Sequence, residues 1–384
     1  RIDLVRDRVQ RIDVSAQMVS LEQGGDLAYD ELVLATGSAS NFFGWPGQDL
    51  PGVQGLYGKP DLDQMEEATR GISHATIIGG GLIGVEMAEM LHSRGIPVSF
   101  LVREAGFWRG VLPAEEAALV EKHIRARHVD LRMGTELEEI VAGADGRVAA
   151  ITTKSGERLD TQFVGITVGV HPNIGFLGGS GIETDRGILV DRELKTSAPH
   201  VWAAGDCVQH REPPPGRRPV EQVWYTGKIM GEYLAANLCG EKLDYRPGIW
   251  FNSAKFFDLE YQTYGVVPSE LPEDQEALVW QDPDGERLFR MQYDKESLAV
   301  TGFNLFGLRG RHAVAEEWIR NETTAPEVVE QSGAFNFEPE FFARFEPQVY
   351  AIAKERFPDL RPLERKKGLG HPLLRRLLAG KGVR

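Results

Sequence analysis

The stretch ATIIGGGLIGVEMAEMLHSRG, residues 75–95, decides the fold of this 384-residue chain. An apolar run typical of a strand leads into GGGLIG at 79–84, and a pattern typical of a helix continues to Gly95. The glycine segment fits GxGxxG between a strand and a helix, the context that a dinucleotide-binding turn requires. Its three fixed glycines permit a tight turn, a close approach to a pyrophosphate and close helix–strand packing. The stretch therefore predicts a Rossmann-like α/β domain, with phosphates at the positive end of the helix.

The sequence after this turn extends the unit. The segment VSFLVRE at 98–104 is typical of a second strand, and residues 113–129 have an apolar face at helical spacing. Two further strands are predicted at 148–152 and 163–168. Together these segments form a βαβ unit with an antiparallel excursion.

The residue at the end of the second strand helps to choose between NADH and NADPH. An acid at this position accepts hydrogen bonds from the ribose hydroxyls of NAD, whereas an arginine suits the 2′-phosphate of NADP. Here the strand ends near Val102, and Arg103, Glu104 and Arg109 follow. The two arginines favour NADPH, although ordinary surface charge is the alternative explanation for them. Glu104 keeps NADH as the alternative nucleotide.

Three more segments combine with the glycine turn to suggest a family. They are YDELVLATG at 29–37, VGVHPN at 168–173 and GILVDRELKTSAPHVWAAGD at 187–206, which contains T-x6-A-x-G-D from Thr196 to Asp206. Over residues 5–240 this order resembles the pyridine nucleotide-disulfide oxidoreductases, flavoproteins with two dinucleotide sites that include the ferredoxin reductases. The resemblance implies two Rossmann-like three-layer α/β domains followed by a C-terminal α+β domain.

In this family the FAD-binding domain is split around the NAD(P)-binding domain. A glycine fingerprint for FAD is therefore expected before Arg1, on the interpretation that the chain is N-terminally truncated. The implied domain boundaries are 1–70 and 191–246 for the FAD-binding domain, 71–190 for the NAD(P)-binding domain, 247–360 for the C-terminal domain and 361–384 for a basic tail.

The family resemblance also implies roles for individual residues. Glu86 resembles an acid near the flavin and is the expected catalytic residue, with a helix-surface acid as the alternative. Trp250 or Phe251 would cover the flavin ring, with a core aromatic as the alternative. The implied FAD and NAD(P)H contacts are Ala35, Thr36, Gly37, Gly79, Gly81, Leu82, Ile83, Gly84, Glu86, Arg103, Glu104, Arg109, Gly169 with Pro172-Asn173, Gly205, Asp206, Glu221 and Gln222.

The expected activity is hydride transfer from NADPH or NADH to FAD, followed by electron transfer to a protein carrier of ferredoxin or rubredoxin type or to a small acceptor. An NADH oxidase, a quinone or CoA-disulfide reductase and a non-catalytic nucleotide-sensing flavoprotein are the alternatives. The family's C-terminal His-Pro motif is absent from GAFNFEPEFF at 333–342, which disfavours disulfide chemistry. His312 and Glu317 do not replace it, because five residues on one helix lie about 140° apart.

Composition and charge limit the remaining classes. The net charge of −14 argues against wholesale nucleic-acid or membrane-surface binding. Cys207 and Cys239, far apart and without a CxxC or metal-ligand cluster, fit a reducing cytoplasm. No apolar run approaches the length of a membrane span, and a homodimer is compatible with the sequence. The tail at 361–384 has eight Lys or Arg and one Glu. It either docks an acidic electron carrier or an anionic surface, or is a disordered, solvated end. The loop at 210–219 is either a gate or acceptor site, or a spacer.

After residue 248 the pattern becomes antiparallel β and then helical. Strands are predicted at 277–281, 287–293 and 297–303, with helical segments over 312–356. A helix is also predicted over 220–240, ending at a glycine.

Overall fold

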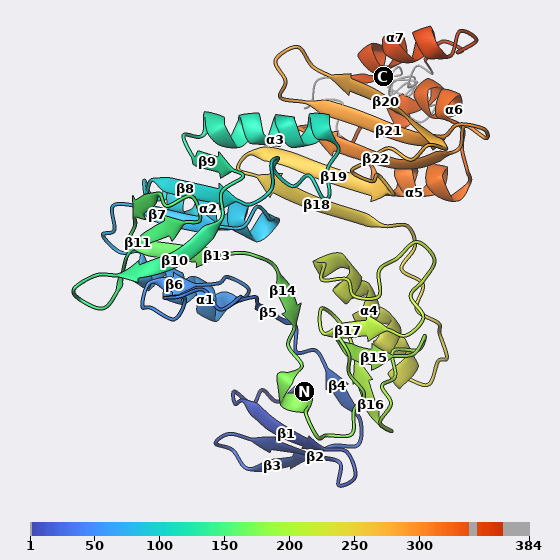
Figure 1. Ribbon diagram of the computed structural model, residues 1–384. Coiled ribbons are helices and arrows are strands. Elements are labelled where there is room, and N and C mark those ends of the chain that lie inside the picture. Colours follow the sequence, from blue (N-terminus) through green and yellow to red (C-terminus); the bar gives the residue numbers. More distant parts are fainter. Residues whose placement is uncertain (1, 338–343, 364–384) are drawn as a thin grey trace, which may run out of the picture. The chain divides into compact units, whose positions relative to one another are not determined.

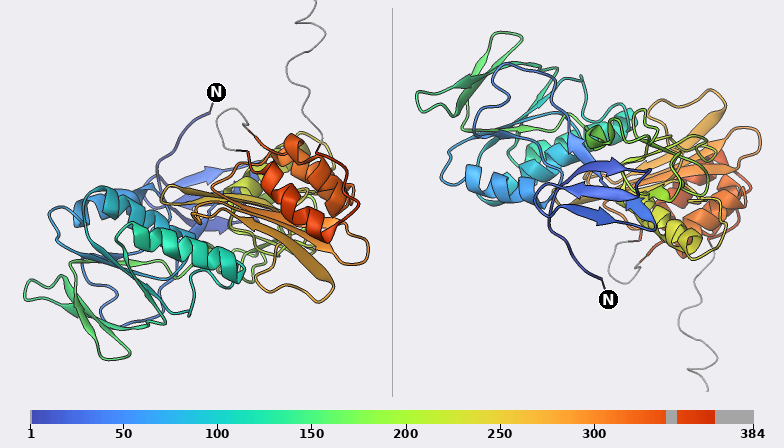
Figure 2. Two further views of the ribbon diagram at one scale, coloured as in Figure 1. Left: turned by 90° about the horizontal axis from the view of Figure 1, so that it is seen from above. Right: turned by 90° about the horizontal axis from the view of Figure 1, so that it is seen from below.

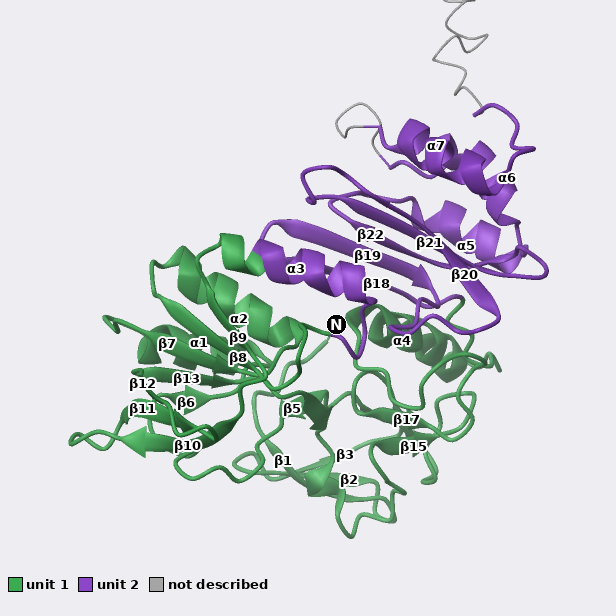
Figure 3. Cartoon of the chain, turned by 45° about the horizontal axis from the view of Figure 1, so that its top comes forward, with its two compact units in different colours: residues 1–108, 124–248 green, residues 109–123, 249–384 purple. Residues whose placement is uncertain are grey.

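The structure is a computed structural model, and it describes residues 2–337 and 344–363. The chain divides into two compact units, one made of residues 1–108 and 124–248 and the other of residues 109–123 and 249–384 (Figure 3). The first unit contains a five-stranded parallel sheet, and the second contains a five-stranded antiparallel sheet. This combination confirms the predicted fold class. Beyond residue 363, the predicted basic tail lies outside the described residues.

The parallel sheet carries the glycine turn. Its strand order is β6-β13-β7-β8-β9. All residues of its three central strands are buried, as expected for a parallel sheet covered on both faces. The strands are β6 (Val53–Gln54), β7 (Ala75–Ile78), β8 (Val98–Val102), β9 (Asp130–Met133) and β13 (Phe163–Ile166).

The two faces of this sheet have different covers (Figures 1 and 2). On one face, helix α2 (Leu82–Ser93) packs against β7, β8 and β13. On the other face, Ile78, Leu101 and Val164 form a core with residues of an antiparallel sheet. That sheet consists of β10 (Leu137–Ala142), β11 (Val148–Thr153) and β12 (Arg158–Asp160). The unit therefore has three layers, as predicted. Helix α1 (Lys59–Ala68) follows β6.

The rest of the first unit is built from short strands around a separate apolar core. Strands β4 and β16 pair in parallel, as do β15 and β17, whereas β5 pairs with β14 in antiparallel fashion. Helix α4 (Trp224–Leu238) contributes Met230 and Leu234 to this core. The strands are β1 (Val9–Asp13), β2 (Met18–Leu21), β3 (Asp26–Ala28), β4 (Leu32–Leu34), β5 (Ser38–Ser40), β14 (Val170–Pro172), β15 (Ile188–Val190), β16 (Val201–Ala203) and β17 (Val208–His210).

The second unit contains an antiparallel sheet with the order β18-β19-β22-β21-β20. One face packs against helices α5 to α7 through Phe303, Trp318 and Val349. Residues of the other face contact helix α3 (Ala114–Ala126), where Glu116 accepts hydrogen bonds from Arg290 and Asn304. The elements are β18 (Phe251–Phe256), β19 (Leu259–Gly265), β20 (Gln275–Gln281), β21 (Leu288–Asp294), β22 (Val300–Phe306), α5 (His312–Arg320), α6 (Ala325–Glu330) and α7 (Glu346–Arg356).

The structure differs from the sequence analysis at four places. Helix α4 begins at Trp224, so Glu221 and Gln222 lie in the loop before it. Strand β8 ends at Val102 rather than at residue 104. Strands β18 and β19 were not individually predicted. Residues 109–123 are grouped with the C-terminal unit, because their contacts with the antiparallel sheet are long-range and carry no local sequence signal.

Candidate functional site

The glycine turn between β7 and α2 needs glycine for steric reasons. Gly79 has φ +109°, and a Cβ there would lie 2.5 Å from the Thr167 carbonyl oxygen. A Cβ on Gly84 would lie 2.7 Å from the Phe100 ring, so Gly84 allows the helix to approach the sheet. At Gly81 the nearest atom would be 4.0 Å away, which leaves the backbone open.

The first turn of α2 leaves its backbone N–H groups available to an anion. Gly81 is the N-cap and provides no side-chain cap, and the first turn contains no acidic residue. Leu82 and Ile83 are its first two residues, and both are half-buried. Because the N-terminal amides of a helix carry partial positive charge, this turn can hold a phosphate group.

The predicted nucleotide-selecting residues are split between the two units. Arg103 and Glu104 follow β8 and form an exposed ion pair with an N–O distance of 2.9 Å. Arg109 belongs to the C-terminal unit, where it approaches Glu270 at 3.8 Å. Within the first unit, Arg103 is therefore the predicted cation at the end of β8.

Glu86 lies on the exposed side of α2. The surrounding chain still removes enough solvent to raise the pKa of its carboxyl above the usual value, and the nearby Glu89 carboxylate adds to this effect. A raised pKa is compatible with both predicted alternatives for Glu86, an acid beside the flavin and an acid on the helix surface.

The ATG turn and the segment at 169–173 lie together. Thr36 donates from Oγ1 to the backbone carbonyl oxygen of Asn173 at 2.8 Å. The backbone amide of Asn173 donates to the carbonyl oxygen of Gly37 at 2.9 Å. The Asn41 amide donates to the Gly169 carbonyl oxygen at 3.0 Å. Gly37 and Gly169 have φ +65° and +94°, a region that favours glycine. Ala35, which precedes Thr36, is exposed.

Gly205 and Asp206 lie at the carboxyl end of β16, beside the ATG turn at the carboxyl end of β4. The two strands pair in parallel, and the Ala204 amide donates to the Leu34 carbonyl oxygen at 3.0 Å. Gly205 has φ +84°, and a Cβ there would meet nothing within 4 Å. This edge of the sheet therefore offers open backbone next to a carboxylate.

The hydroxyl of Tyr57 donates to Asp206 Oδ2 at 2.9 Å. Burial raises the pKa of the Asp206 carboxyl, and the hydrogen bond from Tyr57 partly opposes that rise. A Cβ on Gly37 would lie 2.7 Å from the Tyr57 hydroxyl, so Tyr57 contacts both the ATG turn and the Gly-Asp pair. Sequence reasoning missed Tyr57, because nothing in its local sequence indicates a partner 149 residues away.

The loop before α4 contacts the same group of residues. Gln222 donates from Nε2 to the Ser38 hydroxyl at 2.6 Å, and Ser38 directly follows the ATG turn. Glu221 forms a buried ion pair with Arg217 at 2.6 Å. The structure thus brings together four predicted segments, at residues 35–37, 169–173, 205–206 and 221–222.

Other predicted residues belong to the C-terminal unit. Phe251 begins β18, directly after Trp250, and its ring contacts His312 with a centroid distance of 4.2 Å. His312 lies 3.5 Å from the carboxylate of Glu316, one helical turn away.

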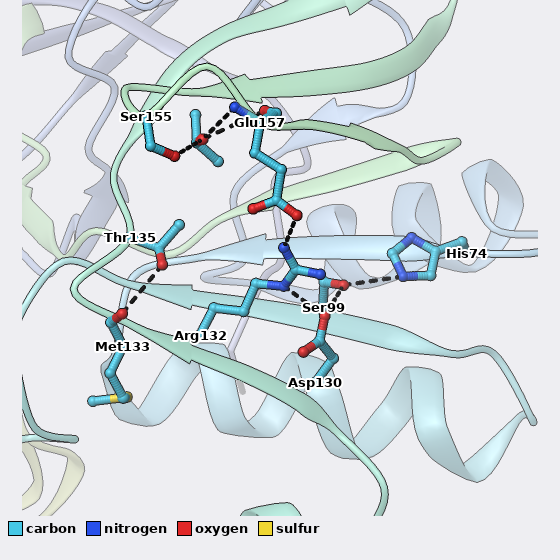
Figure 4. Close-up of polar contacts among 9 residues, drawn as sticks. His74, Ser99, Asp130, Arg132, Met133, Thr135, Ser155 and Glu157 are labelled. Carbon is cyan, nitrogen blue, oxygen red and sulfur yellow. Dashed lines mark hydrogen bonds and ion pairs between the residues drawn. The ribbon is translucent and has the colours of Figure 1, made fainter.

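A second polar network lies at the amino ends of β7, β8 and β9, the opposite edge of the sheet from the glycine turn (Figure 4). Ser99 donates to Asp130 at 2.9 Å, and its oxygen lies 3.2 Å from His74 Nε2. Arg132 joins Asp130 to Glu157 with two contacts of 2.6 Å. The serine hydroxyl is directed at the aspartate and not at the histidine, so this is not the arrangement of a nucleophilic triad.

Two classes of site find no support. The part of the chain that the structure describes contains no group of three His, Cys, Asp or Glu residues that could hold a metal ion. Over the same residues, no helix has the length and apolar character needed to cross a membrane.

Comparison with known proteins identifies the family of this chain. The family model for pyridine nucleotide-disulphide oxidoreductases matches residues 2–227. The rhodocoxin reductase of Rhodococcus erythropolis is 31% identical over 250 residues, which are 65% of this chain and 58% of that protein. A ferredoxin–NAD(P)(+) reductase of Sphingomonas sp. is 29% identical over 261 residues, which are 67% of this chain and 63% of that protein. This chain therefore spans less than two thirds of the length of either reductase.

The fold agrees with a solved structure of the same kind. A FAD-dependent pyridine nucleotide-disulphide oxidoreductase from Desulfovibrio vulgaris superposes with a TM-score of 0.74 and 24% identity, covering 94% of this chain and 91% of that one. The family model covers more than half of this chain. The chain belongs to the pyridine nucleotide-disulphide oxidoreductase family.

Proposed function

We propose that this protein is an FAD-dependent oxidoreductase that accepts a hydride from NAD(P)H and passes electrons to a small redox protein of ferredoxin or rubredoxin type. Membership of the family supports the cofactor pair. The names of the similar rhodocoxin, ferredoxin and rubredoxin reductases support the acceptor class.

One observation carries the proposal: the convergence of separate segments on the carboxyl ends of β4 and β16. The ATG turn, the 205–206 pair and the 221–222 segment all lie there. Gln222 donates to the Ser38 hydroxyl beside the ATG turn, and the Ala204 amide donates to the Leu34 carbonyl oxygen, which aligns the residues that follow the two strands. The open backbone at Gly205 and the half-buried carboxylate of Asp206 fit a polyol chain that donates hydroxyl hydrogens. We assign FAD to Ala35, Thr36, Gly37, Gly205, Asp206, Glu221 and Gln222.

The glycine turn is the proposed NAD(P)H site. The backbone at Gly81 is open, and the uncapped first turn of α2 fits a pyrophosphate. Gly169, in the turn that contacts the ATG segment, is the proposed neighbour of the nicotinamide. We keep NADPH as the favoured nucleotide because Arg103 follows β8, and NADH as the alternative because Glu104 neutralises it.

Within this site the protein's contribution is geometric and electrostatic. Bound FAD would supply the hydride-accepting chemistry. Asp206 accepts a hydrogen bond from Tyr57 and would accept further ones from FAD, Gly169 and the ATG turn would hold the nicotinamide and the flavin, and Glu86 provides a carboxyl group with a raised pKa on α2. Because stacking of the two rings is a proximity effect, no acid–base residue is required for hydride transfer itself.

The proposed domain organisation keeps the FAD-binding domain split around the NAD(P)-binding domain. Pairing of β6 with β13 supports an NAD(P)-binding domain that includes residues 53–54 as well as 71–190, except for residues 109–123, which group with the C-terminal unit. We also propose a reducing cytoplasmic location, since Cys207 and Cys239 are both free thiols.

An anaerobic titration with NADPH and then with NADH tests the function. The purified protein is expected to show flavin absorbance that is bleached by one or both nucleotides. Faster bleaching by NADPH would support the assignment of Arg103. A protein that binds no flavin, or whose flavin neither nucleotide reduces, would contradict the proposal.

A further inference from the structure

The loop of residues 210–219 directs one arginine inward, toward the proposed flavin-binding segment. Arg217 donates from Nε and Nη2 to the two carboxylate oxygens of Glu221, at 2.7 and 2.6 Å. The two side chains are only 5% and 4% exposed. A bidentate pair of this kind fixes orientation as well as distance, because two parallel hydrogen bonds define a plane.

The loop that carries Arg217 is itself anchored. The His210 amide donates to the Pro219 carbonyl oxygen at 2.9 Å, which closes the loop at its base. The His210 ring stacks on Tyr245 at 5.0 Å, with 7° between the ring planes. Arg217 Nη1 also donates at 3.2 Å to the carbonyl oxygen of Gly248, the last residue of the first unit. The loop is therefore held in place at its base and through Arg217, which fixes the position of that side chain.

Hydrogen bonds and adjacent residues connect Glu221 to the ATG turn. The Arg218 amide donates to Glu221 Oε1 at 3.3 Å, which fixes the carboxylate from a second side. The next residue, Gln222, donates to the Ser38 hydroxyl at 2.6 Å. Ser38 is 5% exposed and directly follows Gly37. A displacement of Glu221 would thus be passed to both backbone segments assigned to the flavin.

We infer that Arg217 is a positioning residue of the flavin site: by holding Glu221, it sets the position of the 221–222 segment relative to the ATG turn. This inference rests on the proposed function, because it takes FAD to be bound by these segments. Hydride transfer depends steeply on the distance and alignment of the two rings. Arg217 therefore acts on the rate of flavin reduction through Glu221.

The test compares four forms of the purified holoprotein: wild type, R217Q, R217K and the control R211Q. Arg211 lies in the same loop but forms an exposed pair with Glu183 at 2.5 Å. Stopped-flow reduction by NADH and NADPH is measured per bound flavin, together with the KM for the nucleotide and the thermal midpoint of each variant.

R217Q is expected to reduce its flavin at least about tenfold more slowly at saturating nucleotide, with KM changed by less than about twofold. R217K is expected to fall between R217Q and wild type, because lysine keeps the charge but loses the planar fork. R211Q is expected to match wild type. A merely structural role would lower the thermal midpoint and leave the rate per bound flavin unchanged.

Rates per bound flavin in R217Q and R217K that equal the wild-type rate would overturn the inference. If R217Q does not fold, R217K decides alone by the same criterion. Failure of the proposed function is a different result, because wild type itself would then bind no flavin or show no reduction.

Discussion

Replacement of Asp206 tests the flavin assignment most directly. Its carboxylate is half-buried at the end of β16, and one oxygen already accepts the Tyr57 hydroxyl. A hydrogen bond to a charged acceptor contributes about 1.5–3 kcal/mol, and each 1.4 kcal/mol is about tenfold in affinity. We therefore expect D206A to raise the Kd for FAD about 10- to 100-fold.

Removal of the Asp206 charge should have a different effect on the stability of the apoprotein. Burial raises the pKa of Asp206 in the folded state, so folding favours the protonated carboxyl over the carboxylate. This group stabilises the fold only below its unfolded-state pKa, and that stability is lost as pH rises through the folded-state pKa. At pH 7 the ionised side chain is thus a net cost to the apoprotein. D206N removes the charge but can still accept from Tyr57, so it should raise the free energy of unfolding at pH 7.

Two measurements distinguish a functional role of Asp206 from a structural one. Flavin fluorescence during titration of the apoprotein gives the Kd, and urea unfolding of the apoprotein at neutral and acidic pH gives the stability. The gain in D206N should disappear as pH falls through the titration range of the carboxyl. FAD affinity within twofold of wild type in both D206A and D206N would refute the assignment. Weaker affinity accompanied by an equal loss of apoprotein stability would refute the electrostatic reasoning. The exposed Asp30 provides a control, D30N.

Three further substitutions test other parts of the structure. G79A should abolish NAD(P)H-dependent flavin reduction or prevent folding, because its Cβ would lie 2.5 Å from the Thr167 carbonyl oxygen at φ +109°. R103Q should raise the KM for NADPH about tenfold and leave that for NADH nearly unchanged, because one charge-assisted hydrogen bond contributes about 1.5–3 kcal/mol. E116A should lower the free energy of unfolding by about 3–5 kcal/mol, since it leaves the Arg290 guanidinium, 6% exposed, buried without its closest carboxylate.

Matched controls accompany these substitutions. G95A changes a glycine of positive φ that has open space around it, so it tests strain without a clash. E115A removes the other carboxylate near Arg290, one that is 62% exposed. It should lower the free energy of unfolding, measured with urea, by less than about 1 kcal/mol. Equal losses in E115A and E116A would contradict the argument from burial. Equal changes in KM for the two nucleotides in R103Q would contradict a contact with the 2′-phosphate.

Sequence reasoning worked best where the signal is local. The glycine turn, helix α2 and strands β7 and β8 follow from glycine spacing, apolar runs and a helical period within one stretch of chain. Of the three strands predicted after residue 275, the third, predicted at 297–303, lies three residues before β22 (Val300–Phe306). The other two match β20 and β21 to within two residues, because alternation and the turn at Asp284-Gly285 act between neighbours. The family motifs identified the ATG and Gly-Asp segments for the same reason.

By itself, then, the sequence determined the glycine turn between β7 and α2 and the α/β class, because short-range sterics and periodicity encode them. The order of the segments proposed to form the site followed from the family resemblance. Only the tertiary structure decided which distant residues meet. Tyr57 reaches Asp206 across 149 residues, Gln222 reaches Ser38 across 184, and Arg290 reaches Glu116 across 174. Such contacts depend on how sheets and crossovers bring chain ends together, and no local propensity specifies their partners.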